Sequence, residues 1–258
     1  MLAALAVLAW ARTASAEAAG LHVDWRNDLA ATAAAGGIAL TLASPGLAPG
    51  RCRLCGVGGF DAELREVLRI TDPAEALRAR RVSDVLVSGV LPGGALALSG
   101  LLAREDGTGW RGAGENALVI TETLGLAAVL NGVAKDGFAR RRPAGGDALQ
   151  PGSRNRSFYS GHTSTAFALA AASGTVASLR GSEATPWIWG AGMTLATTVG
   201  YLRIAGDAHW GTDVLVGAAM GGGVGVLVPW LHRGRGRGGL EIVPALRGRG
   251  LGLKLGLP

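Results

Sequence analysis

The feature that most constrains this chain is a series of long segments that are nearly free of charge. They lie at about 84–103, 116–134, 162–179, 187–202 and 212–231, separated by short polar or Gly/Pro-rich links. Each is close to the roughly 20 residues that span a bilayer as an α-helix. Several are rich in Gly and Ala, which let helices pack closely in lipid. We therefore expect an all-α helical bundle with five or six transmembrane helices; a soluble bundle of unusually apolar helices is the alternative.

Composition also favours a membrane protein. Apolar residues make up 48% of the 258 residues and charged residues only 17%, which is few for a soluble surface. The net charge of +6 comes mainly from arginines clustered at the ends of apolar segments, a placement that suits phosphate or lipid headgroups. Aromatic residues are 5% and do not alternate with the basic clusters, so we expect no nucleic-acid partner.

The chain divides into four regions. Residues 1–16 form an apolar run that ends in a small-x-small sequence, which predicts a signal peptide although no Lys or Arg precedes the run. Residues 17–81 form an N-terminal region with a helix at 28–43, a cysteine loop and two amphipathic surface helices. Residues 82–232 hold the apolar segments. Residues 233–258 are a basic, Gly-rich tail that either forms a β-hairpin or stays loose.

Cys52 and Cys55 are the two cysteines of the chain and are spaced C-x-x-C. Two cysteines without an adjacent His cannot complete a four-ligand zinc site. In an exported loop a local disulfide is favoured over a reduced, inert pair.

The first of three polar clusters holds Lys135 and Arg142 at the end of an apolar segment. Their spacing of seven residues is nearly two helical turns, so on a helix they share a face, and Pro143 would end that helix. Two neighbouring cations favour an anion between them. The alternative is an ordinary basic flank of a membrane helix.

The second cluster is Ser160-Gly161-His162, directly before the next apolar segment. Ser is a good N-cap, and the free N–H groups of a helix start bind anions. His162 beside such a site can donate a proton. An ordinary helix cap with a polar surface His is the alternative.

The third cluster is Arg203, His209 and Asp213. On a helix, His209 and Asp213 would be one turn apart, so the carboxylate would contact one imidazole nitrogen and leave the other free as a nucleophile or base. The alternative is a solvated pair of side chains. Glu122 is either a packing contact or functional, and His22 and His232 belong to no cluster.

In order, K-x6-RP, SGH and R-x5-H-x3-D resemble the signature of the type 2 phosphatidic acid phosphatase and vanadium haloperoxidase superfamily, over about 82–232. Tyr159 and Leu202 stand where that family usually has Pro and Ser. The resemblance implies that His209 attacks phosphorus and forms a phosphohistidine, oriented by Asp213, and that His162 protonates the leaving group. It implies that the phosphate oxygens are held by Lys135, Arg142, Arg203, Ser160 and Gly161.

These observations predict a phosphatase of a lipid phosphate or polyprenyl diphosphate that acts without a metal or other cofactor. Phosphoryl transfer requires neutralised charge, which the cations supply, and no carboxylate cluster suited to magnesium lies near them. We expect an inner-membrane protein with the active site on the periplasmic side, because arginines follow the last apolar segment. A vanadate-dependent haloperoxidase and a non-catalytic protein that binds anionic lipids are the alternatives.

Overall fold

The computed structural model describes residues 20–144, 152–234, 240–244 and 251–255. The signal peptide predicted for 1–16 lies outside these residues. The described helices are α2 (Trp25–Ala43), η1 (Pro45–Leu47), α3 (Gly59–Leu68), α4 (Pro73–Val85), η2 (Leu86–Val90), α5 (Leu91–Glu105), α6 (Gly109–Phe138), α7 (Gly161–Leu179), α8 (Thr185–Ala205) and α9 (Gly211–Leu231). The expected all-α bundle is therefore confirmed.

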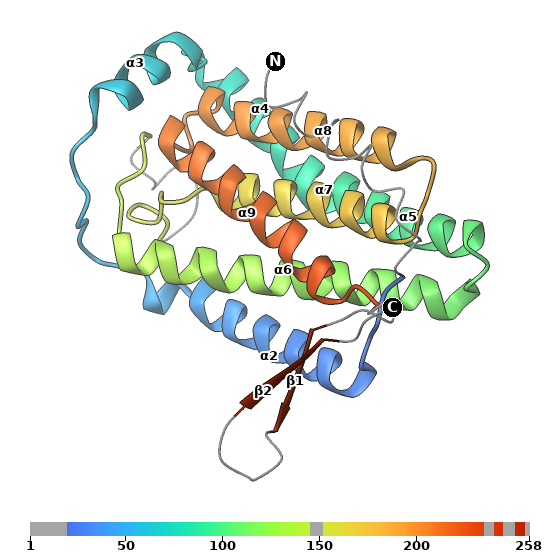
Figure 1. The fold of residues 1–258 in the computed structure, drawn as a ribbon. Coiled ribbons are helices and arrows are strands. Elements are labelled where there is room, and N and C mark those ends of the chain that lie inside the picture. Colours follow the sequence, from blue (N-terminus) through green and yellow to red (C-terminus); the bar gives the residue numbers. More distant parts are fainter. Residues whose placement is uncertain (1–19, 145–151, 235–239, 245–250, 256–258) are drawn as a thin grey trace.

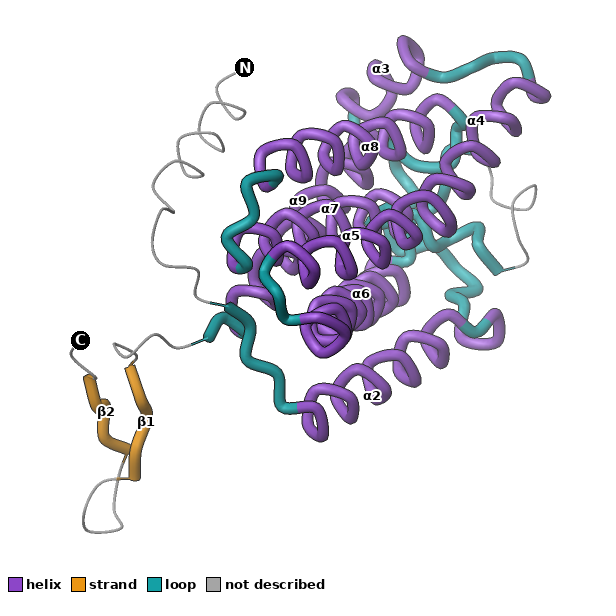
Figure 2. Tube along the Cα trace, turned by 90° about the vertical axis from the view of Figure 1, so that its right-hand side faces the viewer, coloured by secondary structure: helices purple, strands orange, loops and turns teal. Residues whose placement is uncertain are grey.

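Helix α7 lies in the middle of the bundle (Figure 1, Figure 2). It packs against α5, α6, α8 and α9, and every residue from Ala168 to Ala177 is buried. The contact with α9 depends on small residues: a Cβ on Gly221 would lie 2.1 Å from the backbone oxygen of Ser164. Side chains this small let two helices approach at backbone distance, as is common in membrane bundles.

Each of the five apolar segments forms a helix, but by length and composition three helices are suited to cross a membrane. They are Pro73–Glu105, Gly109–Phe138 and Gly211–Leu231. Helices α7 and α8 are continuous, but Thr and Gly residues and, in α7, also Ser residues occur along them and lower the mean hydropathy of both helices. The number of five or six spans therefore stays a prediction.

The first of these helices crosses the expected domain boundary. Helix α4, the π-helical segment η2 and α5 form one continuous helix, Pro73–Glu105, so no break separates residue 81 from residue 82. The π-helical turn precedes Pro92, whose nitrogen has no hydrogen to donate to the preceding turn. The N-terminal region and the bundle thus share an element.

The cysteine loop joins α2 to α3 and carries a bond between the Sγ atoms of Cys52 and Cys55. The backbone N–H of Arg53 donates to the oxygen of Ala139, and that of Arg141 donates to the oxygen of Leu54. The loop is therefore fastened to the end of α6. In the tail, β1 (Leu240–Pro244) and β2 (Leu251–Leu255) pair antiparallel. Of the two alternatives for the tail, a β-hairpin or a loose segment, the structure therefore shows the hairpin.

Candidate active site

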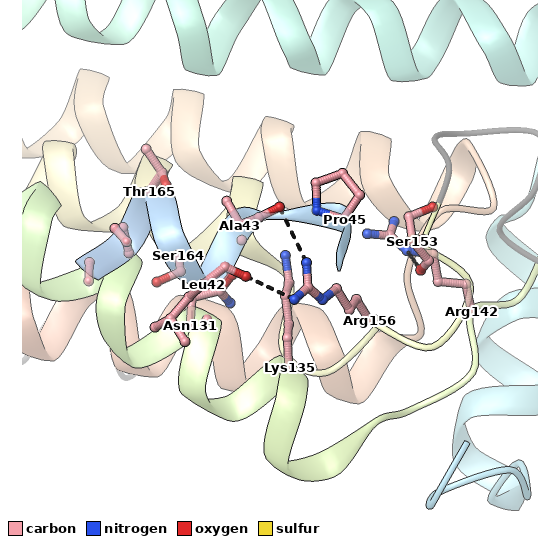
Figure 3. A pocket seen from close by; sticks show the side chains of 16 residues that line it. Leu42, Ala43, Pro45, Asn131, Lys135, Arg142, Ser153, Arg156, Ser164 and Thr165 are labelled. Carbon is pink, nitrogen blue, oxygen red and sulfur yellow. Dashed lines mark hydrogen bonds between the residues drawn. The ribbon is translucent and has the colours of Figure 1, made fainter. Parts of the chain in front are cut away.

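The three polar clusters meet at one end of the bundle. The end of α6, the start of α7, the end of α8 and the turn before α9 all lie there (Figure 1). A cavity of about 310 Å³ opens beside them, lined by polar groups that include Lys135 and Arg142 and by apolar residues of α2 such as Leu42 (Figure 3). Arg156 fastens α2 to this site, because its Nη2 donates to the oxygen of Leu42 (2.8 Å) and its Nε to Asp136 (2.9 Å).

Lys135 and Arg142 do come together, but not along one face of a helix as the spacing suggested. Helix α6 ends at Phe138, because Ala139 adopts a left-handed conformation with φ 44° and its N–H bonds the oxygen of Lys135. Arg142 follows in a loop, and Pro143 does not end the helix. The guanidinium of Arg142 returns to the site by donating to the oxygens of Ser153 (2.9 Å) and Ala208 (3.2 Å).

Ser160 is the N-cap of α7, as expected, and its Oγ accepts from the N–H of Thr163 at 3.4 Å. A Cβ on Gly161 would lie 2.8 Å from Oδ1 of Asn131 and 3.1 Å from Nζ of Lys135. Glycine therefore allows the ammonium of Lys135 to approach the N-terminus of α7. Asn131, which sequence reasoning missed, donates from Nδ2 to the oxygen of Tyr159 at 2.8 Å and holds this approach.

His209 lies in the turn between α8 and α9, not on a helix, so the helical spacing suggested for His209 and Asp213 is wrong, although the two side chains still lie beside each other. Its imidazole Nδ1 lies 3.6 Å from Oδ2 of Asp213, which is longer than a hydrogen bond. Among the described residues, this Nδ1 has no hydrogen-bond partner. The backbone N–H groups of Ala208 and His209 both donate to the oxygen of Arg203, at 3.0 and 3.2 Å, and shape the turn.

The carboxylate of Asp213 is instead occupied by other donors. Oδ2 accepts from the backbone N–H of Trp210 (3.0 Å) and from the hydroxyl of Ser157, and Oδ1 accepts from Arg140 (2.6 Å). The other end of the Arg140 guanidinium bonds Asp61 of α3. This buried, charge-assisted network fixes the start of α9. Nothing in the spacing of the sequence distinguished Arg140 from the arginines beside it.

His162 is paired with a carboxylate that sequence reasoning also missed. Its Nε2 lies 2.8 Å from Oδ1 of Asp84 in α4, and Nη1 of Arg203 lies 2.9 Å from the same atom. Arg203 also donates to Ser83 at 3.0 Å. Asp84 occurs at the end of an amphipathic pattern, where a carboxylate is ordinary, so only the fold places it beside His162.

The electrostatics around His209 are those of an anion site with a neutral imidazole. Burial lowers the pKa of His209 well below its usual value, and the positive charges of Arg142, Arg203 and Lys135 lower it further, followed by His162. Burial, and then Arg203, lower the pKa of Arg142 to about 10, so this guanidinium stays charged at neutral pH. Oxygens of an anion would neutralise the cations, and the unprotonated imidazole is the nucleophilic form.

Part of the chain is similar to known proteins. Residues 116–237 match the PAP2 superfamily. Over 130 residues the chain is 37% identical to the lipid A 1-phosphatase of Porphyromonas gingivalis. The aligned region covers 48% of this chain and 26% of that protein. The chain thus spans about a quarter of the length of this curated relative.

Two solved structures are similar in fold. The transmembrane PAP2 type phosphatidylglycerolphosphate phosphatase of Bacillus subtilis superimposes with a TM-score of 0.54 at 19% identity, over 79% of this chain and 94% of that one. Aquifex aeolicus LpxE gives a TM-score of 0.47 at 22% identity, over 67% of this chain and 95% of that one. The three apolar helices and the first of these folds indicate a membrane protein. The match to the PAP2 superfamily covers residues 116–237, just under half of the chain.

Proposed function

We propose that this chain is a membrane phosphatase that hydrolyses a phosphate ester or diphosphate of a lipid through a phosphohistidine, without a metal at the reacting phosphate. The observation that carries the proposal is the buried imidazole of His209, whose Nε2 lies 3.4 Å from Nη1 of Arg142 and whose pKa is lowered also by the charges of Arg203 and Lys135. Core packing requires no such set of cations. A phosphoryl group in transfer does require it, because negative charge spreads over its oxygens.

In the first step, Nε2 of His209 attacks phosphorus. Nδ1 faces Asp213, and Nη1 of Arg142 lies 3.4 Å from Nε2, where it can hold a phosphate oxygen. The bond from phosphorus to the leaving oxygen breaks as the bond to Nε2 forms, and His162 donates a proton to that oxygen. Burial lowers the pKa of His162, and the carboxylate of Asp84 opposes this change by favouring the protonated imidazole that the donation needs.

In the second step, water attacks the phosphohistidine. His162, now neutral, takes a proton from the water, the phosphorus–nitrogen bond breaks, and inorganic phosphate leaves with His209 restored. The N–H groups of Ser160 and Gly161 at the start of α7 add donors for the non-bridging oxygens. Asp213 acts as a positioning residue through the network that fixes the start of α9.

A lipid substrate is supported by the surroundings of the site. The cavity beside Lys135 continues along apolar residues of α2 and α6, including Ala39, Leu42 and Ala127. A phosphorylated headgroup can therefore meet the cations while its apolar part lies against the helices. The relative is named as a lipid A 1-phosphatase, and lipid A belongs to the same class of substrate, a phosphorylated lipid. Arg233 beyond α9 favours a cytoplasmic end there, which puts His209 on the periplasmic side of the inner membrane.

The test is phosphate release by the full-length protein in detergent micelles with EDTA. The panel holds lipid A, phosphatidate, phosphatidylglycerol phosphate, a polyprenyl diphosphate and p-nitrophenyl phosphate. We expect release from at least one lipid, a loss of about 10³-fold or more in His209→Ala, and an acid-labile, alkali-stable phosphate on the wild-type chain. The matched control is His22→Ala, an exposed imidazole outside the site. Equal activity of the folded His209→Ala variant, or activity only with an added divalent metal, would contradict the proposal.

A further inference from the structure

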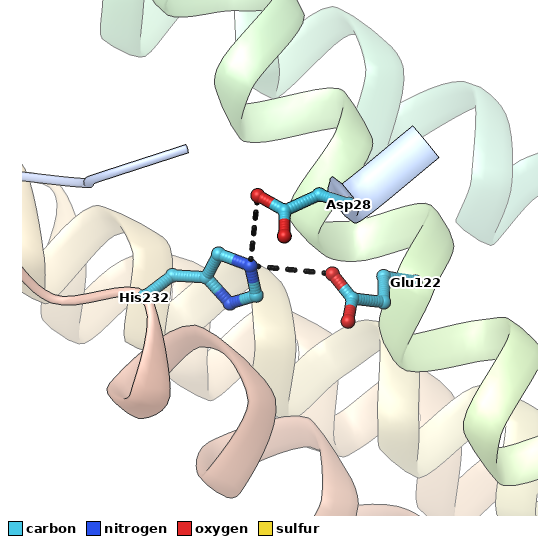
Figure 4. A group of neighbouring side chains, drawn as sticks. All are labelled: Asp28, Glu122 and His232. Carbon is cyan, nitrogen blue, oxygen red and sulfur yellow. Dashed lines mark ion pairs between the residues drawn. The ribbon is translucent and has the colours of Figure 1, made fainter. Parts of the chain in front are cut away.

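A second group of ligating side chains lies where the start of α2, the middle of α6 and the end of α9 meet (Figure 4). Among the described residues, Asp28 in the first turn of α2, Glu122 in the middle of α6 and His232 just after α9 bring one ligand atom each within 4.8 Å of one another. Glu122 precedes Lys135 by 13 residues of α6, which is about 20 Å at 1.5 Å per residue. The group is therefore separate from the phosphate site.

The distances in this group fit an ion between the side chains better than direct ion pairs. Nε2 of His232 lies 3.4 Å from Oδ2 of Asp28 and 3.2 Å from Oε2 of Glu122. Charge-assisted hydrogen bonds are shorter, about 2.7–2.9 Å, and one N–H cannot point at two carboxylates. Two ligands bound at about 2.0–2.1 Å to a tetrahedral zinc ion lie roughly 3.3 Å apart.

The orientation of the imidazole leaves the right nitrogen available. Nδ1 of His232 lies 3.0 Å from the oxygen of Val228, and a carbonyl only accepts, so Nδ1 carries the hydrogen. Metal-binding histidines commonly donate their second N–H to a carbonyl in this way, which leaves Nε2 as the ligand. Oε2 of Glu122 is buried and, within the described part of the chain, has no hydrogen-bond partner.

Charge balance points the same way. Two carboxylates and a neutral imidazole would place two negative charges among the apolar helices α2, α6 and α9, and a protonated imidazole would still leave one. Uncompensated charge is costly in such surroundings. A divalent cation neutralises the two carboxylate charges and can bind one ligand atom of each of the three side chains.

We propose that Asp28, Glu122 and His232 bind a divalent transition metal ion such as zinc. One imidazole nitrogen and two carboxylate oxygens form a donor set suited to zinc, with water as a fourth ligand. The ion ties the start of α2 and the end of α9 to the middle of α6. Its role is to hold the bundle together, because it lies too far from His209 to touch the reacting phosphate.

The experiment uses full-length protein in detergent, stripped of metal and then given zinc or magnesium without substrate. We expect about one zinc per chain by elemental analysis. With free zinc at a hundredfold excess over Kd, we expect a rise in Tm of about 5–10 °C that magnesium does not reproduce. Glu122→Gln, which keeps the shape and removes the charge, should lose both effects. The control His22→Gln changes an exposed His outside the group and should keep both.

A wild-type chain that binds no stoichiometric zinc would overturn the proposal, as would the same zinc-dependent rise of Tm in Glu122→Gln. If Glu122→Gln does not fold, Asp28→Asn serves in its place, because Asp28 lies at the start of α2 rather than inside the bundle. Binding is measured without substrate, so the result is independent of the proposed phosphatase activity. Conversely, EDTA should lower Tm while phosphate release continues at temperatures below unfolding.

Discussion

Replacing Arg142 by Gln tests the electrostatic account of the nucleophile. Nη1 of Arg142 lies 3.4 Å from Nε2 of His209, and both residues are buried. At an effective dielectric constant of about 20, a unit charge at this distance disfavours the protonated imidazole by about 5 kcal/mol.

The direction of the effect follows from the sign of the charge. The guanidinium lowers the pKa of His209, so its removal raises that pKa toward the usual value, although burial, the largest cause of the lowered pKa, remains. The imidazole is then protonated, and no longer nucleophilic, at a higher pH than in the wild type. We expect the acidic limb of kcat/KM to move to higher pH by at least about one unit. The maximal kcat/KM should fall by about 10²–10³-fold, because a cation for the phosphate is lost.

The assay is the initial rate of phosphate release in mixed micelles between about pH 4 and pH 8, because the profile of kcat/KM reports the pKa values of the free enzyme. Arg141→Gln is the matched control: it makes the same change one residue earlier, at an exposed side chain. An acidic limb that stays in place or moves to lower pH in Arg142→Gln would refute the reasoning. So would an equal movement in Arg141→Gln.

Two further substitutions test the positioning of His162 and the packing of α7. Asp84→Asn removes the carboxylate 2.8 Å from His162 and should lower kcat by on the order of 10²-fold. Its Tm should change little, because the Asp84 side chain is 54% exposed; a kcat equal to wild type would contradict its role. Gly221→Ala places a Cβ 2.1 Å from the oxygen of Ser164 and should cost about 1–3 kcal/mol of unfolding free energy. Gly222→Ala meets no described atom within 4 Å and should leave Tm unchanged or raise it; thermal unfolding checks the pair, and the reverse order would contradict the packing.

Much of the bundle could be predicted from the sequence because helix formation depends on local properties. The apolar segments have the composition and length of buried helices, and Asp24, Asp72 and Ser160 cap helices as their side chains favour. The three polar clusters were also identifiable, because each is short and lies at the end of an apolar segment. Their convergence followed from neighbouring helices that run antiparallel, although residues 139–160 form a long connection between α6 and α7.

The errors came from extending helical periodicity past the real helix ends. The spacing of Lys135 and Arg142 suggests one helix face, yet α6 ends at Phe138, before Ala139, a residue without any intrinsic preference for the left-handed conformation that it adopts. The spacing of His209 and Asp213 suggests a helical pair, but His209 lies in the turn before α9, where its backbone N–H donates to the oxygen of Arg203. Helix ends of this kind are set by contacts between segments, which periodicity does not describe.

The sequence by itself determined which segments become helices and which side chains carry the chemistry, because both depend on residue type and on neighbours along the chain. Only the tertiary structure decided which carboxylate each cation and imidazole meets. Asp84 reaches His162 from another helix, and His232 meets Asp28 and Glu122 across three helices. Such pairs are separated by tens to hundreds of residues, so their partners are selected by packing and by the need to balance buried charge.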